Sequence, residues 1–323
     1  MPVAVHRFYV FLALATACLA QDAAPIRELS AAAVADTEVR AVATVLEAQV
    51  ELHRRGFSCG SVDGVMGPQT AAALRAYQRV HGLNETGTLT PEAKASLRLT
   101  MPVMTTHLLS EAEVASLRIF PTTWLERSQQ PTLAHTTVLE LVAERYRASP
   151  RFIRALNPEV DWIEVPAGTP LLVPALGAVA VPGRAAEIRI WLAARELQAV
   201  DANGRVLVHF PVSIARKVEK RPLGELRITV LVREPNYTFD PEVYPESEEA
   251  RQLGRKLIIP PGPNNPVGRA WIGLDLPGYG IHGTPDPEKV GRTESHGCFR
   301  LANWDALALT SLVAVGLPVI VEP

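Results

Sequence analysis

Two runs near the C-terminus, Ile281-His282-Gly283-Thr284-Pro285 and Ser295-His296-Gly297-Cys298-Phe299-Arg300-Leu301, place a cysteine close to two histidines. A cysteine attacks a carbonyl group only as the thiolate, so it needs a base nearby and a group that orients this base. His282 and His296 are the available bases. The pattern therefore predicts either a nucleophile, Cys298, or a metal site built from the same three side chains.

The metal site is the weaker interpretation. A catalytic zinc ion needs three protein ligands and an open position, but His-x-Cys is not a usual zinc spacing. No fourth ligand and no catalytic glutamate stand in a recognisable motif around His282, His296 and Cys298. We therefore expect no metal and no cofactor.

The order His-Gly-Thr followed by Ser-His-Gly-Cys resembles the signature of the L,D-transpeptidase (YkuD) family of peptidoglycan enzymes. Residues 259–268 (IPPGPNNPVG) and Tyr279-Gly280 are similar to the same family. The resemblance implies that Cys298 forms a thioester with the third residue of a tetrapeptide stem and releases the terminal D-amino acid. An amine acceptor would then give a 3-3 cross-link or join the stem to a lysine of a wall-anchored protein.

The same resemblance assigns roles to the catalytic residues. It makes His282 the base, because a neutral imidazole can take the thiol proton and later protonate the leaving amine. It places His296 beside the site, where this ring and the backbone amides near Gly297 stabilise the oxyanion.

Four further residues form the predicted substrate-binding set. Arg300 has the planar fork that holds a carboxylate, although an ion pair with Glu294 or Asp305 is an alternative. The other members are Gly283, Thr284 and Ser295; Thr284, Ser295 and the nearby Asn303 also fit a structural role.

Two other functions remain open. An L,D-carboxypeptidase would use the same chemistry with water as the acceptor. A wall-binding protein without catalysis would belong to a different class, but the presence of both His282 and Cys298 argues against it.

The chain has 323 residues, 27 of them proline, and a net charge of −2. This length suggests two or three domains. Because the charge is balanced and no block of lysine or arginine occurs, nucleic acid is not an expected partner. From Glu187 apolar residues alternate with polar ones, and Asn203-Gly204 marks a hairpin. We therefore expect a mostly-β L,D-transpeptidase catalytic domain at 185–322, with the loop 234–252 as a wall of its cleft.

The first residues have the layout of an export signal. A basic pair precedes an apolar run that is too short to span a bilayer, and small residues follow. We expect a signal peptide at 1–20 and a location in the periplasm or cell envelope, with lipidation of Cys18 as a second possibility. Cys59 is then expected to be a buried free thiol, since a nucleophile must not be held in a disulfide.

Two accessory units are predicted upstream. Residues 42–99 have helical periodicity with turns at Asp63-Gly64 and Gly67-Pro68, and they resemble the three-helix peptidoglycan-binding domain PG_binding_1. Residues 130–175 read as helix, helix and strand, and they resemble a small α+β LysM module whose opening strand is poorly matched at 133–135. The resemblances imply peptidoglycan stem peptides and glycan strands as partners. The LysM-like module either binds glycan or only positions its neighbours.

Overall fold

The computed structural model describes residues 39–177, 183–243, 247–293, 295 and 297–323. The predicted signal peptide, Cys18, Glu294 and His296 lie outside the described residues. Within these ranges no helix is both long enough and apolar enough to cross a membrane.

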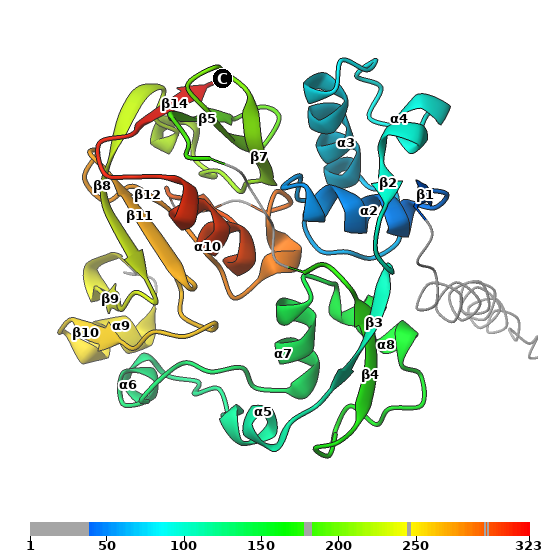
Figure 1. Ribbon diagram of the computed structural model, residues 1–323. Coiled ribbons are helices and arrows are strands. Elements are labelled where there is room, and N and C mark those ends of the chain that lie inside the picture. Colours follow the sequence, from blue (N-terminus) through cyan, green and yellow to red (C-terminus); the bar gives the residue numbers. More distant parts are fainter. Residues whose placement is uncertain (1–38, 178–182, 244–246, 294, 296) are drawn as a thin grey trace, which may run out of the picture.

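One mixed sheet of eight strands is the scaffold of the C-terminal half (Figure 1), in the order β13-β12-β11-β8-β14-β5-β6-β7. Neighbouring strands are antiparallel except for the parallel pairs β14/β5 and β12/β13. This sheet confirms the predicted mostly-β catalytic domain. The strands are β5 (Glu187–Trp191), β6 (Glu196–Val200), β7 (Val206–Pro211), β8 (Gly224–Arg233), β11 (Ala270–Leu274), β12 (Gly280–His282), β13 (Phe299–Arg300) and β14 (Pro318–Glu322).

Helix α10 (Asn303–Leu312) lies against this sheet and encloses the catalytic core. Its Ala306 and Leu309 are fully buried together with the inward residues of β5 and β11, such as Ile190 and Ile272. Burial of this apolar face, at roughly 25 cal/mol per Å², is the main favourable contribution to folding of this domain. Three short 3-10 turns complete it, at Val218–Lys220, Pro241–Val243 and Pro287–Lys289.

The N-terminal unit contains three helices at the predicted places. Thr44 and Glu47 form a capping box at the start of the first helix, and a proline begins each of the other two. A two-stranded ribbon that the sequence did not predict closes the unit. The elements are α2 (Val45–Arg54), α3 (Pro68–Val80), α4 (Pro91–Ser96), β1 (Arg40–Ala41) and β2 (Arg98–Leu99).

Residues 133–135, where the predicted LysM-like module would have its opening strand, form no strand, so that expectation was wrong. Instead β3 (Met104–Leu108) pairs antiparallel with β4 (Pro170–Pro174) beside α7 (Val138–Arg145) and α8 (Pro150–Leu156). Only the last three of these elements lie in the expected module. The segment 109–136, with α5 (Glu111–Ser116) and α6 (Trp124–Ser128), is inserted between β3 and α7.

The inserted segment reaches across to the catalytic domain, and Figure 1 shows α6 close to β10 and α9. Trp124 stacks on Phe239 with 4.4 Å between ring centroids, and Glu249 Oε1 accepts the backbone N–H of Trp124. Leu133 is buried in the same cluster. The inserted segment covers three elements of the catalytic domain, β9 (Tyr237–Phe239), α9 (Glu248–Leu253) and β10 (Leu257–Ile259).

The two upstream units share one buried core, whereas the sequence suggested that each unit could bury its own. Val62 N donates to Arg147 O, and Ser149 N donates to Val62 O, which joins the units through backbone hydrogen bonds. The N-terminal unit also contacts the catalytic sheet, because Ser58 N donates to His209 O. The upstream residues therefore form a single body that is fixed against the catalytic domain.

Asp305 is a buried carboxyl group where these parts meet, and it yields a stability prediction. Burial raises the pKa of Asp305 to about 7, against hydrogen bonds from Ser58 and Trp304 and the charge of Arg147, which lower it. Because this native pKa exceeds the unfolded value, the stability from Asp305 is lost as the pH rises from about 4 to about 7. We expect Asp305→Asn to be more stable than the wild type at pH 8, by on the order of 1–2 kcal/mol, but not at pH 5.

Thermal unfolding at the two pH values measures this difference. Glu219→Gln, at an exposed residue, is the matched control and should show no pH-dependent change. Equal effects of Asp305→Asn at pH 5 and pH 8 would contradict a protonated native Asp305.

Candidate active site

A cavity of about 470 Å³ opens at the end of strand β12 and contains the predicted nucleophile and base. Its lining joins residues of the sheet, of the 3-10 turn at Val218–Lys220, of the β9 region and of the loop before β13. The lining residues are Lys220, Tyr237, Val243, Pro266, Val267, Trp271, Gly278, Tyr279, His282, Ser295, Gly297, Cys298 and Arg300.

Ser295 fixes the loop that carries the nucleophile. Its hydroxyl donates to Cys298 O at 2.5 Å and accepts the backbone N–H of Gly297 at 3.2 Å. The Ser295 backbone is in turn anchored to Ile214 O at 2.8 Å. Buried Ser295 therefore holds the short turn so that Cys298 Sγ faces the cavity, where it lies 3.5 Å from Gly278 O.

His282 is the last residue of β12, and its ring is fixed on two sides. Nδ1 lies 2.6 Å from Gly283 O, and because a carbonyl oxygen only accepts, Nδ1 carries the proton of the neutral ring. The ring also stacks on Trp271 with 5.7 Å between centroids. This arrangement leaves the Nε2 lone pair of His282 to accept a proton.

The two catalytic candidates are neutral at rest. Burial lowers the pKa of His282 to about 4, and the charge of Arg300 acts in the same direction, against the hydrogen bond to Gly283. Burial raises the pKa of the Cys298 thiol, while a backbone hydrogen bond from Gly280 and the charge of Arg300 oppose the rise. The resting pair is therefore thiol and imidazole, and proton transfer accompanies attack on the substrate.

The predicted residues divide into two groups. Cys298, His282, Ser295, Gly297 and Arg300 line the one cavity, and the parallel register of β12 and β13 brings His282 opposite Arg300.

The remaining predicted residues do not line it. Gly283 lies against Asn303 and Gly268, and the Thr284 hydroxyl accepts the backbone N–H of Asp286 at 3.3 Å. Asp305, the alternative partner of Arg300, instead accepts a hydrogen bond from Ser58. Cys59 is a buried free thiol as expected, and the structure also has Cys298 as a free thiol.

Several wall residues were not predicted individually. Trp271 lies on β11, and Tyr279 precedes β12 within a run that had been singled out only for its family resemblance. Tyr237 and Val243 belong to the loop 234–252 that was expected to form a wall. Lys220 stands at the turn before β8 and adds a second cation to that of Arg300. Trp271 and Tyr279 are aromatic residues next to the stretches that resemble the family, and this proximity is the sequence signal that could have identified them.

A second cavity, of about 820 Å³, lies between α7 and α10. Four arginines line it, together with Glu113, His135 and Glu144, but neither Cys298 nor His282 reaches it. The chemistry of a nucleophile and a base belongs to the smaller cavity.

Comparison with known proteins decides the family. Residues 185–321 match the family model described as the L,D-transpeptidase catalytic domain, named YkuD. Residues 185–321 are a YkuD-family L,D-transpeptidase domain. Residues 42–97 match the peptidoglycan-binding family PG_binding_1. The resemblances to YkuD and to PG_binding_1 are thereby confirmed.

Several known proteins are similar to this domain. The candidate L,D-transpeptidase YkuD of Bacillus licheniformis is 27% identical over 186 residues, which are 57% of this chain and 93% of the relative. The candidate L,D-transpeptidase YqjB of Bacillus subtilis is 31% identical over 128 residues, 38% of this chain and 64% of the relative. A solved L,D-transpeptidase of Xylanimonas cellulosilytica is 15% identical to this chain, with a TM-score of 0.36. The match covers 89% of this chain and 97% of the solved chain.

The two families also set the partner and the place of action. One family acts on peptidoglycan and the other binds it, so peptidoglycan is the partner of the L,D-transpeptidase. The protein therefore acts in the cell envelope or outside the cell.

Proposed function

We propose that this L,D-transpeptidase works through a Cys298 thioester. The observation that carries the proposal is the single cavity that holds the Cys298 thiol and the His282 imidazole, whose Nδ1 proton is bound to Gly283 O so that Nε2 is the proton acceptor. Cys298 Sγ attacks the carbonyl carbon of the third stem residue and forms the S–C bond. The C–N bond to the terminal D-amino acid then breaks.

His282 moves the proton through these steps. It takes the thiol proton at Nε2 as Sγ attacks, and it donates this proton to the leaving amine. In the second half the incoming amine attacks the thioester carbon and gives up a proton to His282. The C–S bond then breaks, and His282 returns this proton to Cys298 Sγ. The hydrogen bond from Nδ1 to Gly283 O keeps the ring in the same tautomer throughout.

The backbone around Gly297 and Cys298 is the proposed oxyanion site. The Ser295 hydroxyl holds this turn at both ends, so its N–H groups are oriented before the substrate arrives. His296, beside them in sequence, is proposed to contribute to the same stabilisation. Preorganised donors of this kind typically contribute a factor of about 10²–10³ each to kcat.

Two cations of the cavity suit a substrate that carries carboxylates. Arg300 and Lys220 both line the cavity, and a guanidinium can bind a carboxylate with two parallel hydrogen bonds. We propose that they hold the carboxylates of the stem peptide, with Tyr237 and Trp271 as the walls beside its chain.

The acceptor separates transpeptidation from carboxypeptidation. We propose an amine, either the side chain of another stem or a lysine of a wall-anchored protein. Trp271, Tyr279 and Tyr237 line the cavity around Cys298, which favours exclusion of water from the thioester. We further propose export by the N-terminal segment to the periplasm, where a lipid on Cys18 is one means of retention.

A purified disaccharide tetrapeptide is the substrate that tests the acceptor. We expect release of the terminal D-amino acid and formation of 3-3 linked dimers, separated by chromatography and identified by mass. Shortened monomers alone would establish the carboxypeptidase instead. A chelator should leave the reaction unchanged and iodoacetamide should stop it; inhibition by the chelator would contradict the thiol mechanism.

A further inference from the structure

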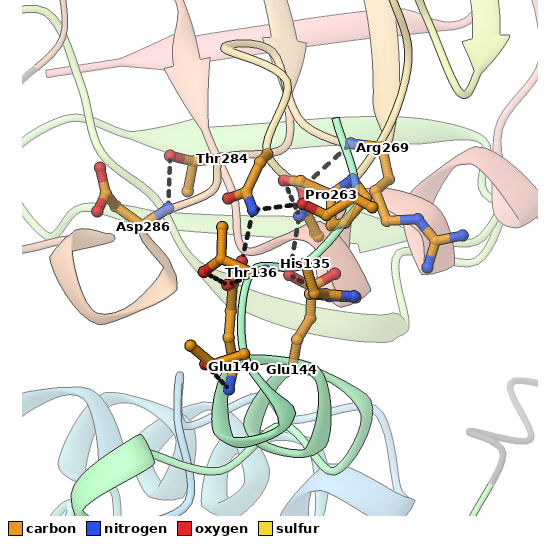
Figure 2. A network of polar contacts seen from close by, with 12 residues as sticks. His135, Thr136, Glu140, Glu144, Pro263, Arg269, Thr284 and Asp286 are labelled. Carbon is orange, nitrogen blue, oxygen red and sulfur yellow. Dashed lines mark hydrogen bonds and ion pairs between the residues drawn. The ribbon is translucent and has the colours of Figure 1, made fainter. Parts of the chain in front are cut away.

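Helix α7 of the LysM-like module contacts the catalytic domain through two carboxylates one turn apart. Figure 2 shows Glu140 and Glu144 rising from this helix toward Pro263. Glu140 Oε1 accepts Asn264 Nδ2 at 2.6 Å, and Glu144 Oε2 accepts Asn303 Nδ2 at 3.1 Å. Both asparagines belong to the catalytic domain, so these bonds cross between the two parts of the chain.

The Asn303 side chain is buried, and its amide has a partner on each side. Its exposed fraction is 1%. Nδ2 donates to Pro263 O at 3.1 Å as well as to Glu144, and Oδ1 accepts the Arg269 N–H at 3.1 Å. Among the described residues Glu144 is the carboxylate partner of this amide, and together with Pro263 O and the Arg269 N–H it fixes which end of the amide is the donor.

The oxygen end of Asn303 touches the backbone that follows the catalytic base. A Cβ atom at Gly268 or at Gly283 would overlap Asn303 Oδ1, so the backbone there must come this close. Gly268 has a φ of +61°, which a glycine adopts without strain. If the amide turned over, its NH2 group would face the Arg269 N–H, and that hydrogen bond would be lost.

Gly283 is the link from Asn303 to the chemistry. Its N–H donates to Ala270 O at 3.1 Å, and its carbonyl oxygen accepts from His282 Nδ1. The peptide groups around Gly283 are therefore held between β11 and Asn303. Any shift of this segment moves the acceptor that selects the His282 tautomer.

We propose that Glu144 is a positioning residue of the active site. By accepting from Asn303 Nδ2 it orients the Asn303 amide, which holds Gly283 in place and keeps the proton of His282 on Nδ1. The LysM-like module is then part of the catalytic apparatus rather than only a tether to the wall. This inference rests on the proposed role of His282 as the base.

The position of Glu144 suits this role. Its side chain is 12% exposed, and its other neighbour is His135, with Nε2 at 3.7 Å. A largely desolvated carboxylate makes a stronger hydrogen bond than an exposed one, because water competes less for the donor. Glu144 also lines the 820 Å³ cavity, so its removal enlarges this open space.

Three variants of the full chain test the proposal. Glu144→Ala should lower kcat by roughly 10- to 100-fold with little change in KM, because a misplaced base affects the chemical step. Glu144→Gln keeps an acceptor oxygen and should recover most of kcat. Glu140→Ala is the matched control: it removes the other α7 hydrogen bond to the catalytic domain without touching Asn303, and kcat should stay near the wild-type value.

A spectroscopic readout separates positioning from loss of folding. Imidazole ¹⁵N shifts of the wild type should show His282 protonated at Nδ1 alone, with His282→Gln identifying the signal. Glu144→Ala should give a mixture of tautomers, and Glu144→Gln should restore the single one. This readout needs no acyl transfer, so it still decides the inference if the proposed activity fails.

Two results would overturn the proposal. One is a folded Glu144→Ala protein with wild-type kcat and a single His282 tautomer. The other is an equal loss of kcat in all three variants that follows their melting temperatures, which would reduce Glu144 to a contact that only stabilises the fold.

Discussion

Cys298→Ala should lower acyl transfer by at least about a thousandfold, because it removes the proposed nucleophile from the cavity. The fold should survive, since Ser295 holds the loop through the Cys298 carbonyl oxygen and not through the thiol. The disaccharide tetrapeptide assay measures the loss, and the melting temperature verifies the fold.

The other described thiol provides the control. Cys59 is buried at 3% exposure in the upstream core and lies outside the cavity. Cys59→Ala should therefore retain transpeptidation, although it costs about 1 kcal/mol of stability through the space that it leaves. Dimers produced by Cys298→Ala would refute the thioester mechanism.

His282→Gln should lower kcat by roughly 10²–10⁴, the range for loss of a general base. The pH dependence of the wild type identifies the same residue. His282 must be neutral to accept the thiol proton, and its pKa of about 4 keeps it neutral throughout the neutral range. We therefore expect kcat/KM to hold down to about pH 5 and to fall below that value.

A profile of kcat/KM between pH 3.5 and pH 9 tests this expectation. An acid limb near pH 6.5 would mean that the essential base is not the buried His282. The rate of alkylation of Cys298 gives an independent measure. Because burial raises the pKa of this thiol, the rate should keep rising above pH 9, whereas a plateau below pH 7 would indicate a preformed thiolate.

The catalytic segment was predictable because its geometry is mostly local. His282 ends one strand, Cys298 begins the run into the next, and the strands β12 and β13 pair directly. The alternation from Glu187 likewise indicated the sheet, because a strand with one buried face has a period of two. Family resemblance added the roles that spacing alone left undecided between a nucleophile and a metal site.

Contacts between distant segments were not predictable in the same way. Strand β3 has the sequence Met-Thr-Thr-His-Leu, which contains little apolar signal, and its partner β4 follows only after the whole inserted segment. Asn303 was expected to be structural. Its neighbours Glu144, Pro263 and Arg269 come from two stretches that are far from it in the chain, so no local pattern could show that it lies behind the catalytic base.

The stacking of Trp124 on Phe239 bears on how such a domain can be exchanged between proteins. Phe239 and Ile259 have no exposed surface in the full chain, and Leu133 of the inserted segment is buried with them. A chain cut at residue 185 would expose this apolar patch and would tend to aggregate. Recombination that moved 185–321 to another protein would succeed only if a segment that buries this patch moved with it. Residues 109–136 and the catalytic domain are therefore expected to be inherited as one unit.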